Sequence, residues 1–423
     1  MAAIFLARER LPCNLLTRQS PEMFSAALIF TATYAVIAMG RLPGSRLDRS
    51  GAALVGASLM VASGTLSLED AYRAIDLDTL TLLLGMMILV ANLRLAGFFG
   101  LAAQAVARRA RHPVLLLIGV LLVSGVLSAF LVNDTVCLML TPLVAEIAWA
   151  LRRAPVPYLL AVAMASNIGS TATITGNPQN MLIGSFSHIP YGRFAAALAP
   201  VAGLSLIVAA ALLVIFFRAE FWTRERLAPV ELAVRLNRAL LAKSLIAVAA
   251  AVGLFFLGEA PAKVAILVGA LLLITRRIKP ARVYAEIDWA LLLMFAGLFI
   301  VTAGLERAVL TPKLSAEVAA MGLDRPALLA LVAAALSNLV SNVPAVLVLK
   351  PFLAALADER AWLVLAMAAT LAGNFTVLGS VANLIVVERA RRRGIEIGFW
   401  THFRIGAPLT LATIALGLWL LRS

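Results

Sequence analysis

The 423-residue sequence is poor in the residues that build most metal and nucleophile sites. It has two cysteines, Cys13 and Cys137, which excludes a disulfide framework and argues against a zinc site. Its three histidines, His112, His188 and His402, are scattered near loops, and no HExxH motif occurs. No serine or aspartate pair has the pattern of an intramembrane protease. We therefore expect no enzyme, no catalytic residue, no metal centre and no cofactor.

Charged residues are also scarce, at 14% of the chain, whereas 62% of it is hydrophobic. No polar block is long enough to hold a separate soluble domain. Apolar runs recur along nearly the whole length, and a helix needs roughly 20 apolar residues to cross the hydrocarbon core of a bilayer. The sequence therefore predicts an all-α polytopic membrane protein that is surrounded by the lipid bilayer.

The formal net charge of +14 does not indicate a nucleic-acid partner. The basic residues fall in short loops between apolar runs, which is how membrane proteins set their orientation, and they are not clustered with aromatics on one face. Residues 1–22 form a basic tail that lacks the charge, apolar core and cleavage site of a signal peptide. Met1 and Met23 are both possible starts, since "MFSAALIF" opens the first apolar run.

The chain contains two copies of one module. "SAFLVNDTVCLMLTPLV" at 128–144 matches "SNLVSNVPAVLVLKPFL" at 337–353, a shift of 209 positions. "GNPQN" at 176–180 matches "GSVAN" at 379–383, a shift of 203 positions. Further short matches keep the same order and nearly the same shift, which chance similarity among apolar helices seldom does. Such internal similarity indicates a duplicated structural unit.

We predict an N-terminal tail (1–22), a first repeat (23–217), a cytoplasmic linker (218–239) and a second repeat (240–421). Each repeat reads as about five transmembrane helices plus a re-entrant hairpin and a broken helix, although the hairpin region could also cross twice. In either case each repeat crosses an odd number of times, so the two repeats are inverted. The loops on one side hold most of the Lys and Arg, which predicts that this side is cytoplasmic and that both termini lie outside.

Four polar interruptions break the apolar runs, at 132–135, 169–180, 341–344 and 373–383. Irregular backbone at membrane depth must be buried in protein or line a cavity, because lipid cannot pair its N–H and C=O groups. Inverted repeats whose broken helices meet near the midplane are typical of secondary transporters, in which half-helix N-termini face anions and unwound carbonyls hold cations. The interruptions therefore predict one binding site built from two hairpin tips and two broken helices.

The candidate substrate-binding residues are the amide and hydroxyl side chains of these interruptions. They are Asn133, Thr135, Thr171, Thr173, Asn177, Asn180, Ser341, Asn342, Thr376, Ser380 and Asn383. Two structural alternatives stay open at this point. The hairpin-tip asparagines can simply cap the following arm, and helical threonines often bond back to their own backbone.

The candidate ion- or proton-coupling residues are Asp134, Gly176, Pro178 and Gly379. A buried carboxylate such as Asp134 is costly in a membrane and marks an ion or proton site by default. Its structural alternative is an N-cap for an arm that begins at Thr135. The glycines and the proline explain why the helices unwind, since they permit unusual backbone and remove a donor.

The motifs "FLVNDTVCLMLTP", "TATITGNPQNMLIG", "LSNLVSNVPAVLVL" and "GSVANLIV" resemble the signatures of the ion transporter superfamily. This group includes citrate-transporter-like permeases, arsenite efflux pumps, divalent anion symporters and certain sodium/proton antiporters. The resemblance spans about residues 25–420 and implies a bacterial inner-membrane protein. It also implies a scaffold part that can form a homodimer and a transport part that moves past it.

In divalent anion symporters, the hairpin-tip asparagines and the Thr, Pro and Asn of the broken helix contact carboxylate and sodium. The matching positions here are Asn133, Asn342, Thr173, Pro178, Asn180 and Asn383. The symporters' Ser-Asn-Thr triplet is absent, because the tips read "NDT" at 133–135 and "SNV" at 341–343. The Asn-Asp tip is more similar to the arsenite pumps and proton-linked members.

These observations predict a secondary active transporter of a small anion, a carboxylate or an inorganic oxyanion, coupled to H⁺ or Na⁺ and working by alternating access. Arsenite or antimonite efflux and sodium/proton antiport are the alternatives within transport. A channel or a transport-derived receptor predicts a continuous pore and no coupling acid, and both Asp134 and the inverted repeat argue against it.

Overall fold

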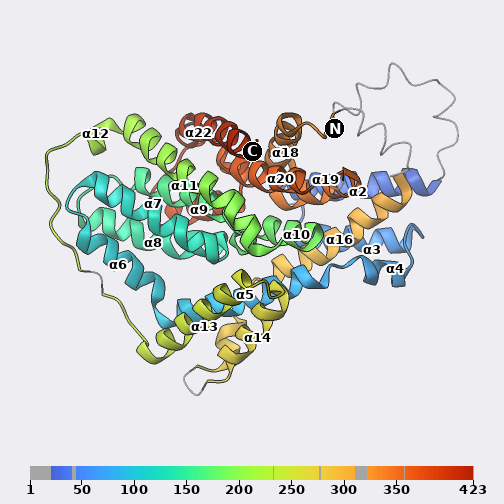
Figure 1. Ribbon diagram of the computed structural model, residues 1–423, viewed down its shortest axis with the longest axis horizontal. Helices are drawn as coiled ribbons and strands as arrows, with labels where there is room; N and C mark the ends of the chain where they lie inside the picture. The colour runs from blue at the N-terminus through green and yellow to red at the C-terminus, as the bar shows by residue number, and fades with distance from the viewer. Residues whose placement is uncertain are drawn as a thin grey trace. The chain divides into compact units, whose positions relative to one another are not determined.

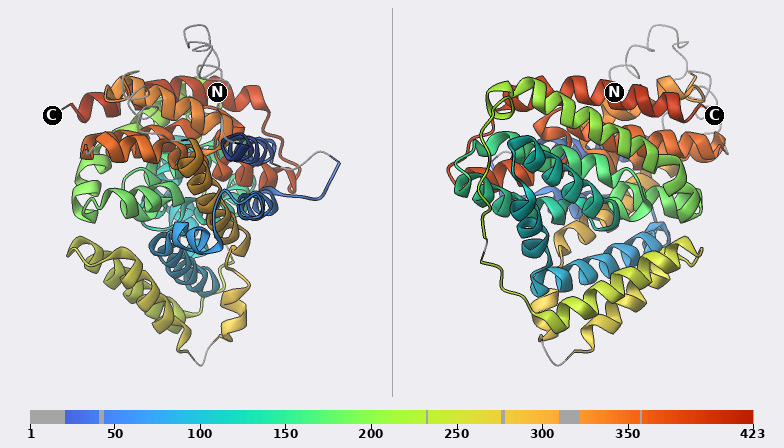
Figure 2. Two further views of the ribbon diagram at one scale, coloured as in Figure 1. Left: turned by 90° about the vertical axis from the view of Figure 1, so that its right-hand side faces the viewer. Right: turned by 60° about the vertical axis from the view of Figure 1, so that its left-hand side comes forward.

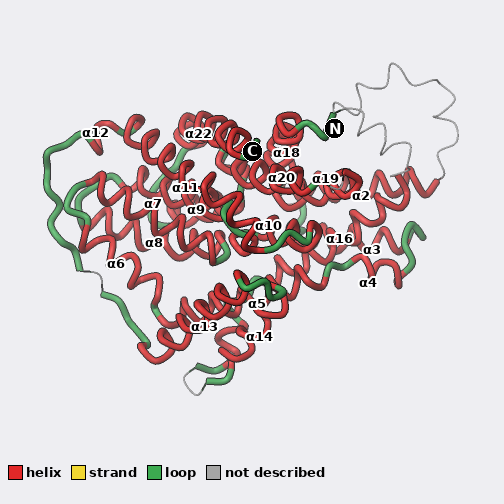
Figure 3. Tube along the Cα trace, viewed as in Figure 1, coloured by secondary structure: helices red, strands yellow, loops and turns green. Residues whose placement is uncertain are grey.

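The computed structural model describes residues 21–40, 44–231, 233–275, 278–309, 322–356 and 358–422. These residues form helices joined by turns and loops, and Figure 3 shows no strand among them. Most of the predicted tail, and with it the question of the start, lies outside the described residues. Chain contacts define two compact units, Met1–Asp76 with Leu293–Ala320 and Leu77–Leu292 with Met321–Ser423. We refer to them as unit 1 and unit 2.

Unit 1 is a small helical group. It consists of α2 (Pro21–Met39), α3 (Arg49–Ala62), α4 (Leu68–Ala74) and α16 (Trp289–Val309) from Leu293 onward. α2 packs on α3, and a Cβ added to Gly297 of α16 would lie 2.6 Å from the backbone of Ala53 in α3. The hydroxyls of Tyr34 and Thr302 are 3.2 Å apart. Glycine and small residues thus let these helices pack closely, as is common in membranes.

α4 is a seven-residue helix that begins at a serine cap. The Ser67 side chain accepts a hydrogen bond from the backbone N–H of Asp70, and the carboxylate of Asp70 pairs with Arg307. The Ser67 hydroxyl and then Arg307 hold the pKa of Asp70 below its usual value. This pair joins α4 to the end of α16 within unit 1.

Unit 2 holds the rest of the chain. Its first part consists of α5 (Leu77–Ala96), α6 (Phe98–Arg109), α7 (Pro113–Phe130), α8 (Asn133–Ala150), α9 (Pro155–Ser170), η3 (Ile174–Gly176), α10 (Pro178–Ser187), α11 (Tyr191–Phe216), α12 (Arg218–Phe221), α13 (Arg238–Phe256), α14 (Pro261–Leu273) and α15 (Pro280–Tyr284). Its second part consists of α18 (Pro326–Val340), α19 (Asn342–Leu356), α20 (Glu359–Leu371), η4 (Ala372–Asn374), η5 (Val377–Gly379), α21 (Val381–Arg391) and α22 (Phe399–Leu420).

Six described helices are long and apolar enough to cross a membrane by length and composition. They are Leu77–Ala96, Pro113–Phe130, Tyr191–Phe216, Arg238–Phe256, Trp289–Ala308 and Phe399–Leu420. Shorter apolar helices, α3 and α14 among them, accompany these six. The prediction of an all-α polytopic membrane protein is therefore confirmed.

The predicted hairpins and broken helices are present in unit 2 (Figure 1). α7 and α8 form the first hairpin, with residues 131–132 between them, and α18 and α19 form the second, with only Ser341 between them. The first broken helix runs α9–η3–α10, and the second runs α20–η4–η5–α21. α9 packs on α7 and α8, and α20 packs on α18 and α19, so each broken helix lies against its own hairpin.

In Figure 2 the predicted linker, 218–239, contains the long loop between α12 and α13, and polar bonds join its first part to the loops of the first repeat. Arg153 pairs with Glu220 at 2.8 Å, and both side chains are only 11% exposed. The Nε2 of His112 is 2.9 Å from the carbonyl oxygen of Thr223. The linker is therefore held at defined points along its first part.

Candidate functional site

The first broken helix is interrupted by residues that supply their own caps. α9 ends at Ser170, and α10 begins at Pro178, which needs no backbone donor at the first helical position. Asn177 has an extended backbone, and its Oδ1 accepts the N–H of Asn180 at 2.8 Å. A Cβ on Gly176 would lie 2.3 Å from the carbonyl oxygen of Ser170, so only glycine fits this close approach.

An asparagine side chain bonds to the backbone carbonyls of the interruption in each repeat. Asn180 donates through Nδ2 to the carbonyls ten and seven residues before it, those of Ser170 and Thr173, each at 3.0 Å. Asn383 donates to the carbonyls at the same two spacings, Gly373 at 2.7 Å and Thr376 at 3.0 Å. These bonds satisfy carbonyls that the helix break leaves without an intrahelical partner. The shift of 203 positions thus relates two structurally equivalent asparagines.

Asn167 connects the first broken helix to the second. Its Nδ2 donates to the Oδ1 atoms of Asn374 (3.0 Å) and Asn383 (3.1 Å), and its Oδ1 accepts from the hydroxyl of Ser380 at 3.0 Å. The side chain is fully buried. All three partners lie more than 200 residues away along the chain.

Thr370 makes the reciprocal connection. Its hydroxyl oxygen accepts from Asn177 Nδ2 at 3.3 Å and from Gln179 Nε2 at 3.1 Å, and it lies 3.4 Å from Asn180 Oδ1. Thr370 follows Asn167 by 203 positions, so the two residues are repeat equivalents. Each broken helix therefore contacts the point where the other helix resumes. We call this group of residues the cross-brace. Its members are Asn167 with its partners Asn374, Ser380 and Asn383, and Thr370 with its partners Asn177, Gln179 and Asn180.

The two hairpin tips reach the cross-brace. Asn133, at the start of α8, donates through Nδ2 to Asn167 Oδ1 at 3.3 Å, and its own Oδ1 is buried without a hydrogen bond to any described residue. With its amide turned so that oxygen and nitrogen both find partners, Asn342, at the start of α19, accepts from Gln179 Nε2 at 3.3 Å and donates to the carbonyls of Ala369 and Gly379. The structure thus brings together both predicted hairpin-tip asparagines and both broken helices.

Ser341 holds a strained backbone at the second tip, with φ +80° and ψ 159°. This region is populated almost only by glycine, and a residue held there costs about 1–3 kcal/mol. Strain of this kind is often found at ligand sites and switch regions.

Asp134 lies in the first turn of α8, next to Asn133. The N-cap position of this helix is Val132, so the structural alternative, in which Asp134 caps an arm that begins at Thr135, is wrong. The helix starts two residues earlier because the Val132 carbonyl already accepts from the N–H groups of Thr135 and Val136. Asp134 is half-buried, and no hydrogen bond or ion pair joins its carboxylate to a described residue. The first hairpin tip thus carries a carboxylate that no described hydrogen bond or ion pair holds in place.

Three of the four predicted threonines make side-chain hydrogen bonds within the protein. Thr171 bonds back to the carbonyl of Asn167 at 3.2 Å, as the structural alternative predicts. The hydroxyl of Thr173 donates to the Ala129 carbonyl in the first hairpin, and Thr376 donates to Asn338 Oδ1 in the second at 3.2 Å. Thr173 and Thr376 therefore tie each broken helix to its own hairpin. Thr135 is half-buried on α8 and makes no side-chain hydrogen bond to a described residue.

Several residues of the site were missed by the sequence analysis, namely Asn167, Thr370, Gln179, Asn374 and His402. Shifting the first interruption by 203 positions pairs Asn167 with Thr370, and this signal was present in the sequence. His402 is 1% exposed, and its Nε2 donates to the carbonyl oxygen of Asn374 at 3.0 Å. The equivalent residue in the first repeat, 208 positions earlier, is Phe194, and this gave no reason to expect a hydrogen bond here.

Apart from the Asp134 carboxylate at the first tip, the polar groups of the site are neutral side chains and helix ends. α8, α10, α19 and α21 begin at the hairpin tips and interruptions, and a helix N-terminus carries free N–H groups and partial positive charge. The cross-brace consists of amides and hydroxyls. No group of three or more His, Cys, Asp or Glu residues is placed to hold a metal in the described part of the chain. This arrangement can bind an anion through N–H groups without a cationic side chain.

A buried polar site made from two broken helices and two hairpins, within a polytopic all-helical protein, defines a membrane transporter. The citrate transporter family model matches residues 34–372, so the chain belongs to the citrate transporter family. An uncharacterized transporter of Mycobacterium bovis is 32% identical, over 93% of this chain and 97% of that protein. The silicon efflux transporter LSI3 of Oryza sativa subsp. japonica is 29% identical, over 94% of this chain and 97% of that protein.

The fold is also similar to a solved structure. The YdaH transporter of Alcanivorax borkumensis, described as having an unusual topology, superposes with a TM-score of 0.60. The alignment covers 95% of this chain and 96% of that one, at 14% sequence identity. At this identity the similarity shows a shared fold. Membership of a transporter family confirms the expectation that the protein is a transporter and not an enzyme.

Proposed function

We propose that the protein is a secondary active transporter of a small anion, a carboxylate or an inorganic oxyanion. The observation that carries the proposal is the cross-brace, which joins two interrupted helices at a buried polar site bordered by four helix N-termini. Helix N-termini bind anions through free N–H groups and the positive end of the dipole. Substrate binding is assigned to Asn133 and Asn342 at the tips.

Coupling to H⁺ or Na⁺ is the second part of the proposal. Asp134 is a half-buried carboxylate at the first tip, and the neighbouring Asn133 Oδ1 is a buried acceptor without a described donor. A carboxylate and an unpaired amide oxygen are oxygen ligands that suit a small cation or a proton. The second tip has Val343 at the equivalent position, so coupling belongs to the first repeat.

Efflux of arsenite or antimonite is an alternative function. The bonded side chains of the cross-brace are neutral, and they suit an uncharged hydroxylated solute as well as an anion. Two further observations support this alternative. The rice relative is named a silicon efflux transporter, and the first tip has the Asn-Asp sequence.

The test is a thermal-shift screen of the purified protein followed by flux measurements in proteoliposomes. The panel contains citrate, succinate, sulfate, phosphate and arsenite, each with and without Na⁺ and at several pH values. We expect one anion to raise the melting temperature and to accumulate against its gradient when a H⁺ or Na⁺ gradient is imposed. Accumulation of arsenite alone supports the alternative, and flux that no ion gradient can drive uphill contradicts secondary active transport.

We also propose that the protein lies in a bacterial inner membrane with both termini outside, and that it forms a homodimer. Single cysteines placed in loop 108–112 or in loop 276–282 should be protected from impermeant thiol reagents in intact cells. Cysteines at 188–190 should be labelled. Labelling of the first two loops from outside would overturn the topology.

A further inference from the structure

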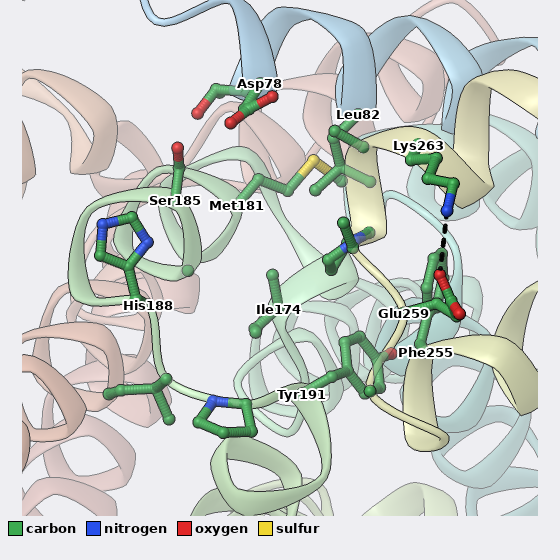
Figure 4. A pocket seen from close by; sticks show the side chains of 18 residues that line it. Asp78, Leu82, Ile174, Met181, Ser185, His188, Tyr191, Phe255, Glu259 and Lys263 are labelled. Atoms are coloured by element: carbon green, nitrogen blue, oxygen red, sulfur yellow. Dashed lines mark hydrogen bonds and ion pairs between the residues drawn. The ribbon is translucent and has the colours of Figure 1, made fainter.

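A cavity of about 380 Å³ lies beside the first broken helix in unit 2 (Figure 4). It is bordered by the start of α5, the end of α10, the turn into α11 and the connection between α13 and α14. Ile174 of η3 and Met181 of α10 form part of its wall. The interrupted helix is therefore one face of this cavity.

Tyr191 links the cavity to the polar interior of the interruption. It lines the cavity, it is 3% exposed, and its hydroxyl is 2.8 Å from Thr175 Oγ1. Thr175 Oγ1 is in turn 3.4 Å from Thr173 Oγ1. The Tyr191 ring packs against Phe255, with ring centres 5.1 Å apart, which fixes its position. A chain of hydroxyls thus runs from the cavity wall into the broken helix.

The charged groups of the cavity lie at its rim. Lys263 and Glu259 form an ion pair at 3.3 Å, with side chains 65% and 49% exposed. Figure 4 shows the Asp78 carboxylate across the cavity from Lys263, on the side of Ser185 and His188. Among the described lining residues, Lys263 carries the permanent positive charge, and two carboxylates oppose it.

We infer that this cavity is an outer recognition site for the transported anion, with Lys263 as the recognising cation and Glu259 as its internal competitor. The inference rests on the proposed function and adds a specificity determinant outside the cross-brace. An exposed ion pair is worth little to the fold, so its partners can exchange cheaply. An arriving anion takes the place of the Glu259 carboxylate at Lys263 before it reaches the hydroxyls of Tyr191 and Thr175.

Two substitutions at the ion pair must act in opposite directions on an anion. Glu259→Gln frees Lys263 and removes a repelling charge, so KM falls. Lys263→Gln leaves Glu259 unopposed, so KM rises. We expect changes of about three- to five-fold at low ionic strength that shrink as salt is added, because exposed charges are screened within about 10 Å at 0.1 M.

The matched control is the exposed pair Arg392–Glu388, which has the same four-residue spacing at the end of α21 and lies outside the cavity. Glu388→Gln removes the same charge from a similar pair, and it should leave KM unchanged. Initial rates are measured in right-side-out and in inside-out vesicles with the anion of the citrate, succinate, sulfate and phosphate panel that the wild type transports. The opposite shifts are expected in one vesicle orientation only.

The KM values of the three variants and the substrate of the wild type decide whether the recognition site exists. Opposite KM shifts for the two cavity variants, absent in Glu388→Gln, support it. Unchanged KM values, or shifts of the same sign, overturn the recognition site. If the wild type still transports the anion in that case, the proposed function stands. A wild type that transports arsenite, which is uncharged at neutral pH, and none of the anions overturns both.

Discussion

Replacing Asn167 by alanine tests whether the cross-brace holds the two broken helices together. The fully buried side chain makes four hydrogen bonds. It accepts from Asn133 Nδ2 and Ser380 Oγ, and it donates to the Oδ1 atoms of Asn374 and Asn383. Asn167→Ala removes all four bonds at once, three of which cross from the first repeat to the second.

The expected cost follows from these bonds and from the groups they leave behind. Side-chain hydrogen bonds between membrane helices average about 0.6 kcal/mol, so four of them give about 2.5 kcal/mol. Asn133 Nδ2, Asn374 Oδ1 and Asn383 Oδ1 have no other described hydrogen bond, and a buried unpaired polar group costs about 1–3 kcal/mol. Partial hydration of the new space reduces that penalty. We expect a loss of about 3–6 kcal/mol in the free energy of unfolding.

Asn92 supplies the matched control, since it is also fully buried in an apolar helix. Its Nδ2 donates only to the carbonyl of Ile88, one turn earlier, and its Oδ1 has no described partner. Asn92→Ala should therefore cost less than about 1 kcal/mol, because one bond is lost and an unpaired oxygen is removed with it. Thermal melting and denaturant unfolding of the purified variants measure the difference. Equal destabilisation by the two substitutions would refute the cross-brace.

Further substitutions at three positions test the rest of the site. Asp134→Asn should leave a folded protein in the membrane but abolish gradient-driven accumulation, because it removes the carboxylate that we propose for coupling. Full pH-dependent transport by this variant would exclude that role. His402→Phe, which introduces the residue found at the equivalent position Phe194, should cost about 1–3 kcal/mol by leaving the Asn374 carbonyl unpaired. His402→Gln keeps a donor and should recover part of that loss, and equal melting temperatures for both variants would contradict the role of the bond. Ser341→Gly should raise the melting temperature because it relieves backbone strain. The expected gain in the free energy of unfolding is about 0.5–2 kcal/mol, after the greater flexibility of glycine in the unfolded chain is subtracted. A fall in melting temperature would contradict the strain.

Most of the fold is readable in the sequence because each feature is local. Runs of apolar residues give the spanning helices, and the Gly, Pro and Asn residues of 169–180 mark the place where α9 ends and α10 begins. The internal similarity predicts the second interruption, although it has fewer polar residues than the first. The tip asparagines follow from their position between two apolar arms.

The cross-brace could not be predicted in the same way. Asn167 lies within an apolar helix, and its partners are fixed only by how two helices more than 200 residues apart pack together. The roles of the threonines also depend on packing, since Thr171 faces its own helix while Thr173 reaches the first hairpin. The alternative in which Asp134 caps the helix was wrong by two residues, which is within the usual uncertainty of a helix end.

The cross-brace also has a consequence for how the protein is made. When the first repeat has been synthesised and inserted, the Asn167 amide N–H groups still lack the acceptors that residues 374 and 383 provide. The first broken helix therefore cannot complete its polar interior by itself, and it must keep these groups hydrated or shielded until almost the whole chain has emerged. The two halves of the site are therefore far apart in the sequence and are complete only together.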